Sequence, residues 1–192
     1  MSDLSSSYVD LISSTTIDLY NTLFSRLSEM EQAQERLARQ QAEVSFIEGA
    51  GQELRDAAFE GLQRQKLKLQ STERALDVYD LSINVVAGAV LQIAKQGIAI
   101  RHGSRDACPE GRAILGTCAR ELIWHGRNQA MHYEDTKPSS TWISLFTSLS
   151  EKLPGRFSIE APFMSRAKDV FDLLGWESYE QYEADMRQLC SE

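Results

Sequence analysis

The side chains that could do chemistry lie together in one segment of the 192-residue chain, from Glu121 to Tyr133. If this segment is a helix, at about 100° per residue, four of its polar side chains fall on one arc of roughly 60°. These four are Glu121, His125, Asn128 and His132. A solvated helix face is the plain alternative, but Glu and Lys would serve such a face as well as two histidines and an amide. The composition of the arc therefore favours a catalytic or binding surface.

A metal site is a second alternative for this arc, because Glu121, His125 and His132 could supply one carboxylate and two imidazoles. The helix between Glu121 and His132 would span roughly 16 Å at ~1.5 Å per residue, which is too far for one ion. Only Glu121 with His125, or His125 with a residue of another helix, could share a metal. The chain also lacks the common nucleotide-binding, hydrolase, zinc-protease and calcium-loop motifs. We therefore expect no metal and no cofactor.

The charge of the chain is unevenly distributed. Its net charge of -8 argues against non-specific binding of nucleic acid by the chain as a whole. Residues 95–133, however, hold more basic than acidic side chains and contain all three histidines, whereas residues 1–94 and 134–192 are acidic in sum. We therefore expect any phosphate chemistry in this central block.

Long helices are expected to position the central block. No proline precedes Pro109, and apolar residues recur at helical spacing from Tyr20 to Ile47 and again from Leu54 to Ile93. Glycines at 49 and 51 can close the first helix, since glycine tolerates a left-handed turn. The pattern predicts an antiparallel helical hairpin over residues 20–101.

Shorter helices should follow the hairpin. A third helix is expected over residues 111–133 and ends before the break at residues 137–140. Further helices are predicted over residues 141–149, over 162–174 with Pro162 in the first turn, and over 178–189. Ser178 and Gln181 have the spacing of a capping box. We find no alternating pattern typical of a strand.

These patterns predict an all-α fold, an antiparallel helical bundle with a long N-terminal helical hairpin. We expect residues 1–150 to form the bundle and residues 151–192 to form a C-terminal helical extension packed on the same domain. The most apolar stretch, residues 83–94, is about half the ~20 residues of a spanning helix, so we expect no membrane partner. Three cysteines without a C-x-x-C pair and a start unlike a secretory signal predict a cytoplasmic protein with reduced thiols.

The end of the central block resembles the catalytic motif of the HEPN superfamily. These are all-α proteins with the signature R-x(4–6)-H, in which a polar residue, commonly Asn, follows the arginine. In this chain the motif reads Arg127-Asn128-Gln129-Ala130-Met131-His132. The bare pattern is weak, and Arg120 with His125 matches it as well. Requiring Asn directly after Arg lowers the expected number of chance matches to about 0.003.

The resemblance implies a metal-independent endoribonuclease, or RNase, with Arg127, Asn128 and His132 as catalytic residues. Members typically dimerise so that two copies of the motif face each other across a two-fold axis. Histidine titrates near neutral pH, so His132 would accept the ribose 2′-OH proton. The planar fork of Arg127 would stabilise charge on the phosphate. Asn128 would orient the imidazole or hold the phosphate, and cleavage would leave a 2′,3′-cyclic phosphate.

Substrate contacts are expected from other residues of the central block. These are His125, Arg120, Arg101, Arg105, Arg112 and Tyr133. The resemblance further implies RNA and a second copy of the chain as partners, an antitoxin or regulatory protein as a third partner, and a toxin, stress or anti-phage defence role. The alternative of a different class is a non-catalytic helical module that dimerises through the hairpin and binds RNA or protein.

Overall fold

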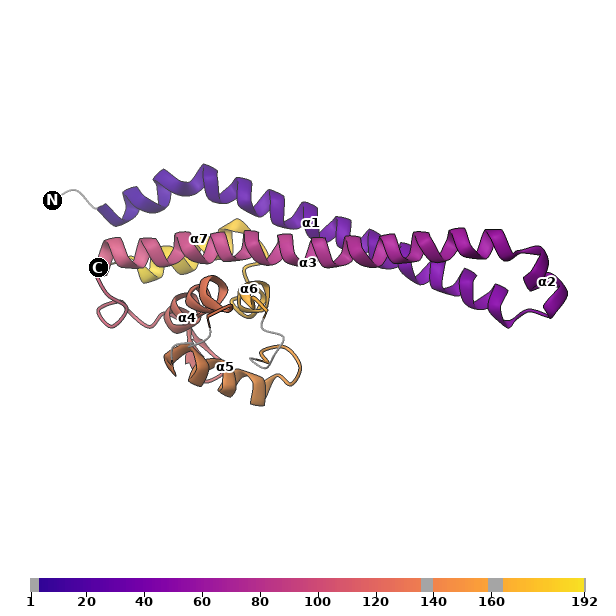
Figure 1. The fold of residues 1–192 in the computed structure, drawn as a ribbon. Coiled ribbons are helices and arrows are strands. Elements are labelled where there is room, and N and C mark those ends of the chain that lie inside the picture. The colour runs from indigo at the N-terminus through magenta and orange to yellow at the C-terminus, as the bar shows by residue number, and fades with distance from the viewer. Residues whose placement is uncertain (1–3, 136–139, 159–163, 192) are drawn as a thin grey trace. The chain divides into compact units, whose positions relative to one another are not determined.

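The computed structural model describes residues 4–135, 140–158 and 164–191, and these are almost entirely helical (Figure 1). Within these ranges the chain forms seven helices and one two-stranded sheet. They are α1 (Leu4–Gly49), α2 (Gln52–Ala57), α3 (Phe59–His102), β1 (Ala113–Ile114), β2 (Thr117–Cys118), α4 (Ala119–His132), α5 (Ser140–Lys152), α6 (Ala167–Leu173) and α7 (Tyr179–Leu189). The all-α prediction is confirmed.

Two helix boundaries differ from those predicted. Helix α1 begins at Leu4 and not near Tyr20, since no proline or glycine interrupts the segment between them. Helix α4 begins at Ala119, because residues 113–118 form a short antiparallel hairpin. Its turn residues Leu115 and Gly116 both have positive φ, of 46° and 78°, as a tight two-residue turn requires. The expectation of a helix from residue 111, with no strand, was therefore wrong.

The C-terminal helices follow their sequence signals with shifted ends. Helix α7 starts after Ser178, whose backbone N–H donates to the Gln181 side chain at 3.0 Å, so the predicted capping box is present. Helix α6 begins at Ala167. Pro162 and residues 137–139 of the predicted break lie outside the described residues.

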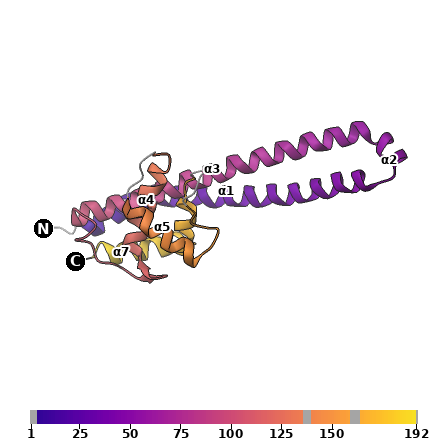
Figure 2. The ribbon, with the colours of Figure 1, turned by 60° about the horizontal axis from the view of Figure 1, so that its bottom comes forward.

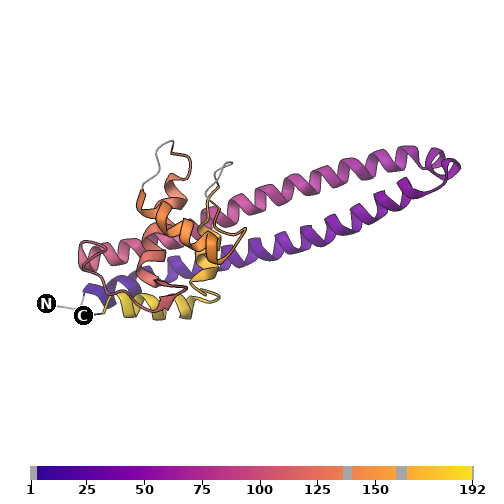
Figure 3. The same cartoon turned by 90° about the horizontal axis from the view of Figure 1, so that it is seen from below.

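The chain divides into two compact units. The bundle unit comprises residues 1–23 and 84–192, and the hairpin unit comprises residues 24–83. In the hairpin unit the parts of α1 and α3 run antiparallel and are joined around α2 (Figures 2 and 3). Glu48 and Lys66 form an ion pair of 2.6 Å between them. Several large apolar side chains of this unit are more than half exposed. They are Phe46, Phe59, Leu67, Val78 and Leu81.

An aromatic cluster fills the core of the bundle unit. Trp176 and Tyr182 are fully buried and meet edge to face, with ring centroids 5.0 Å apart. Tyr20 of α1 packs on Phe171 of α6 at 5.4 Å. The buried Asp185 accepts a hydrogen bond of 2.8 Å from the Trp176 indole. Because these contacts join α1, α6 and α7, the segment after residue 150 is part of the core of this unit.

Helix α3 is long and apolar enough to cross a membrane by length and composition alone. The sequence argument did not identify this property, because it considered only residues 83–94. In the structure 44% of the most apolar window is buried inside the protein. Core helices of soluble proteins commonly satisfy the same criterion, and the buried residues of α3 include Val90, Leu91 and Ile98.

Helix α4 lies against α5 and α6 in the bundle unit (Figure 1), and its contact with α6 is unusually close. Gly126 is buried, and a Cβ at this position would lie only 2.7 Å from Cγ1 of Val170. The helices therefore approach through the missing side chain. This contact determines which residues of α4 face α3 and which face outward.

We expect Gly126→Ala to lower the free energy of unfolding by about 1–3 kcal/mol, because the added methyl overpacks the contact with Val170. Gly88→Ala is the matched control, since its Cβ would meet Ala130 and Ala167 at ordinary distances of 3.6 and 3.8 Å. Alanine also favours a helix interior, so this control should be neutral or stabilising. Urea unfolding followed by circular dichroism measures both variants, and equal losses would contradict the packing argument.

Candidate functional site

The motif segment lies in the second half of α4, and its side chains point in several directions. Gln129 is buried and ties α4 to the segment before α6: its Nε2 donates to the Met164 carbonyl at 2.7 Å, and its Oε1 accepts from the Arg166 N–H at 2.8 Å. Arg127 and Asn128 reach α3. Met131 is 56% exposed. The polar residues of the motif therefore do not share one environment.

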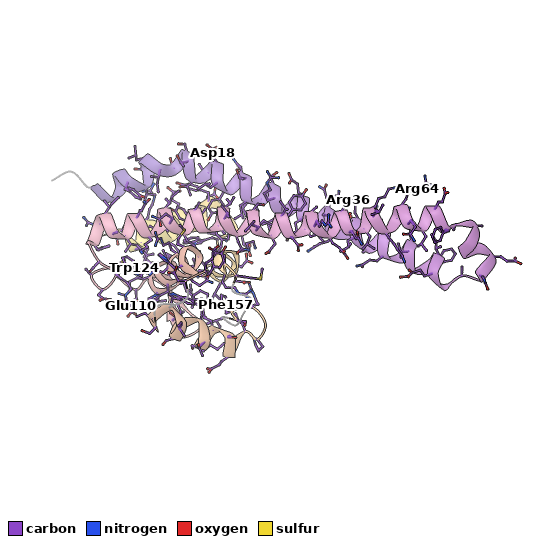
Figure 4. All side chains as sticks on the ribbon, in the orientation of Figure 1. Asp18, Arg36, Arg64, Glu110, Trp124 and Phe157 are labelled. Atoms are coloured by element: carbon purple, nitrogen blue, oxygen red, sulfur yellow. The ribbon has the colours of Figure 1, made fainter. Side chains whose placement is uncertain are left out.

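Arg127 and Asn128 form a cluster with two residues of α3. Asn128 Oδ1 accepts a hydrogen bond from Lys95 Nζ at 2.8 Å and lies 3.4 Å from Nη1 of Arg127. The Nε of Arg127 donates to Oε1 of Gln92. Lys95 Nζ also lies over the ring of Trp124, 4.5 Å from its centroid (Figure 4). We call these five residues the cation cluster.

The cation cluster has no compensating carboxylate. Neither Lys95 nor Arg127 forms an ion pair with any described residue, and both donate to neutral amide oxygens instead. Partial burial lowers the pKa of Lys95, and the neighbouring charge of Arg127 lowers it further. Two half-buried cations that share a neutral acceptor leave a local excess of positive charge. Such a pair is suited to binding an anion, above all a phosphate.

His132 lies one turn beyond Asn128 at the end of α4 and is half exposed. Its Nδ1 is 3.1 Å from Oδ2 of Asp135. If Nδ1 carries the proton that binds this carboxylate, Nε2 carries the lone pair and is the nitrogen that can accept a proton. Within the described residues no contact joins His132 to Arg127. The motif arginine and histidine are therefore not brought together within one chain.

The second match to the bare motif, Arg120 with His125, has a different environment. His125 is buried, and its Nε2 lies 2.9 Å from Nη1 of Arg105 and 3.2 Å from Oε2 of Glu121. Since Arg105 is always a donor, Nε2 accepts and Nδ1 carries the proton, where it is buried without a partner. Burial lowers the pKa of His125, the charges of Arg105 and Lys95 lower it further, and Glu121 opposes them.

The same geometry answers the alternative of a metal shared by Glu121 and His125. A guanidinium nitrogen of Arg105 already occupies the position beside His125 Nε2 and Glu121 Oε2. A divalent cation would have to displace it. In the part of the chain that the structure describes, no group of three or more His, Cys, Asp or Glu side chains is placed to hold a metal.

The other predicted substrate contacts are spread over the bundle unit. Arg112 binds Asp185 at 2.8 Å, and Arg120 donates to the Cys108 carbonyl at 2.6 Å. Arg101 is half-buried in the last turn of α3. Tyr133 follows His132, and a hydrogen bond to Glu134 raises the pKa of its hydroxyl. None of these four contacts the cation cluster among the described residues, and RNA binding by them stays a prediction.

A pocket of about 360 Å³ opens beside the β-hairpin and the first turn of α4. Its lining includes Arg120 and Glu121 but neither Arg127 nor His132. Both lining side chains pair with each other at 3.0 Å. The pocket is therefore separate from the cation cluster and from the motif histidine.

Sequence reasoning did not single out Lys95, Gln92, Trp124 or Asp135. Lys95 counted only toward the charge of the central block, and Gln92 lies in an apolar stretch of α3. A signal was present for Asp135, because it follows His132 by three residues, the spacing of a helical pair. The contacts from α3 had no such signal, because they join positions more than thirty residues apart.

The buried His125 predicts a pH dependence of stability. Its pKa is lowered in the folded protein, so the unfolded chain binds more protons, and the free energy of unfolding falls as the pH drops through the ordinary histidine value near 6.5. We expect urea unfolding between pH 7.5 and 5 to show this loss, and to show a smaller loss in His125→Gln. An identical pH slope in the variant would contradict the assignment of His125 as neutral and buried.

Comparison of the chain with family models, with curated proteins and with solved structures found no match. The argument for a function therefore starts from the cation cluster and from His132. The geometry offers an anion site without carboxylates, formed by α3 and α4. It also offers an accessible imidazole with one nitrogen held by Asp135.

Proposed function

We propose that this chain is a metal-independent endoribonuclease of HEPN type. The observation that carries the proposal is the pair of cations Lys95 and Arg127, which share Asn128 and have no carboxylate partner among the described residues. In a chain with a net charge of -8, uncompensated cations are an electrostatic cost unless an anion binds them. A phosphodiester supplies that anion, and RNA alone supplies the 2′-OH that the reaction needs.

The residues of the site have complementary roles in this proposal. His132 accepts the 2′-OH proton at Nε2, with its ring oriented by Asp135. Arg127 stabilises the charge that develops on the phosphate as the 2′-oxygen attacks. Asn128 positions the cations and releases them to the phosphate when the substrate binds.

The site is proposed to form across a dimer. Arg127 and His132 lie on different sides of α4, so one chain does not bring them to the same phosphate. A two-fold axis beside the end of α4 would place His132 of one protomer near the arginine of its partner. The exposed Met131 next to His132 supplies apolar surface for such a contact. The proposed setting is the cytoplasm, in a toxin, stress or defence role, with an antitoxin or regulatory protein as a further partner.

One observation favours the non-catalytic alternative, a helical interaction module. The hairpin unit exposes several large apolar side chains, of which Phe46 is 74% exposed and Leu67 is 65% exposed. Scattered apolar surface of this kind is typical of a docking segment. A well-folded protein that cleaves no RNA would favour this function.

We expect His132→Ala to slow RNA cleavage by about 10²–10⁴-fold in excess EDTA, because it removes the general base. Arg127→Lys should also be strongly impaired, since an ammonium cannot keep the contact with Gln92 and bind phosphate through two nitrogens. His125→Ala should be mild, because that ring is buried and bound to Arg105. Cleavage of one labelled RNA by the three variants, with circular dichroism as a folding control, measures this. Unchanged cleavage by His132→Ala would refute the mechanism.

The dimer predicts a mass of about twice 21.6 kDa by light scattering at micromolar concentration. It also predicts complementation, because a mixed dimer of His132→Ala and Arg127→Ala keeps one complete site. After random exchange of subunits, the mixture should regain about a quarter of wild-type activity. A monomeric mass, or no recovery in a mixture shown to exchange, would contradict a shared site.

A further inference from the structure

We propose that Lys95 is a catalytic residue outside the motif, which donates a proton to the 5′-oxygen that leaves during RNA cleavage. The inference rests on the proposed function and concerns the same site. It adds a residue of α3 that the motif does not contain and gives it a role that the motif residues do not fill.

The placement of Lys95 is the first support. Its Nζ lies 2.8 Å from the same Asn128 oxygen that Arg127 Nη1 approaches at 3.4 Å, so the two cations converge on one point. An ammonium has three donors, and Asn128 takes one of them. A phosphate held by Arg127 at this point would therefore contact Lys95, whose ammonium is further confined by the face of Trp124.

The second support is that the neighbouring side chains do not suit the role. Arg127 does not release a proton near neutral pH, and Asn128 has none to give. His125 accepts at Nε2 from Arg105, and its Nδ1 is buried. Tyr133 has a raised pKa because of its hydrogen bond to Glu134, which makes it a weaker acid.

Lys95, in contrast, becomes a better proton donor where it stands. Partial burial and the charge of Arg127 both lower its pKa, toward the range in which an ammonium can act as a general acid. Bound phosphate would raise the pKa again, so that the proton is held until charge moves from the phosphate to the leaving oxygen. The group is therefore charged when the substrate binds and acidic when the bond breaks.

The step balances as follows. The 2′-oxygen forms a bond to phosphorus as its proton passes to Nε2 of His132. The bond between phosphorus and the 5′-oxygen breaks, its electron pair stays on that oxygen, and the oxygen takes a proton from Lys95. The products are a 2′,3′-cyclic phosphate and a 5′-hydroxyl. The imidazolium of His132 and the neutral amine of Lys95 then exchange protons with water.

The test compares ordinary RNA with RNA that carries sulfur in place of the bridging 5′-oxygen at one linkage, because a thiolate leaves without protonation. Lys95→Arg keeps the positive charge but is a very weak acid, and Lys95→Gln removes the charge as well. We expect both variants to cleave ordinary RNA about 10²–10⁴-fold more slowly and the sulfur-substituted RNA within about tenfold of wild type. His132→Ala should be slow on both substrates.

Lys168→Gln is the matched control and should be fully active, since Lys168 pairs with Asp172 on α6 at 2.6 Å. Wild-type activity in Lys95→Arg would overturn the proton-donor role, as would equal slowing of the Lys95 variants on both substrates. A folded wild type that cleaves neither substrate would refute the proposed function and this inference together. The first two outcomes, with an active wild type, would refute this inference alone.

Discussion

The close contact between α4 and α6 at Gly126 is the constraint on which the rest of the site depends. Val170 occupies the space where a side chain at position 126 would stand, so α4 cannot rotate about its axis without a clash. Gln129 adds two hydrogen bonds to the segment before α6. With α4 held in this orientation, Arg127 and Asn128 must face α3, and His132 must emerge at the end of the helix.

This orientation separates the charged side chains into two kinds of environment. Around His125, each cation meets a carboxylate: Arg105 contacts Glu121 and Asp106, and Arg120 also contacts Glu121. Around Asn128, the cations meet only amide oxygens. The first arrangement is electrostatically complete and stabilises the start of α4. The second leaves donor groups for an anion, which is the physical difference between a structural cluster and a binding site.

The two matches to the bare R-x(4–6)-H pattern illustrate why position in the fold matters more than the pattern. Both have an arginine five residues before a histidine on the same helix. In the first, His125 is buried and its Nε2 is bound by Arg105. In the second, His132 is half exposed and its Nδ1 is bound by Asp135. Only the second histidine has a nitrogen that a substrate can reach.

The sequence by itself determined the helical class, the hairpin, the α7 capping box and the position of the motif on α4, because helical spacing, proline and glycine act over a few residues. It could not determine that His125 is buried while His132 is exposed, since both fall on one arc of the helix. Nor could it place Gln92 and Lys95 beside the motif. Those contacts exist because the packing of α4 on α3 and α6 joins residues far apart in the chain, and only tertiary structure decides such pairings.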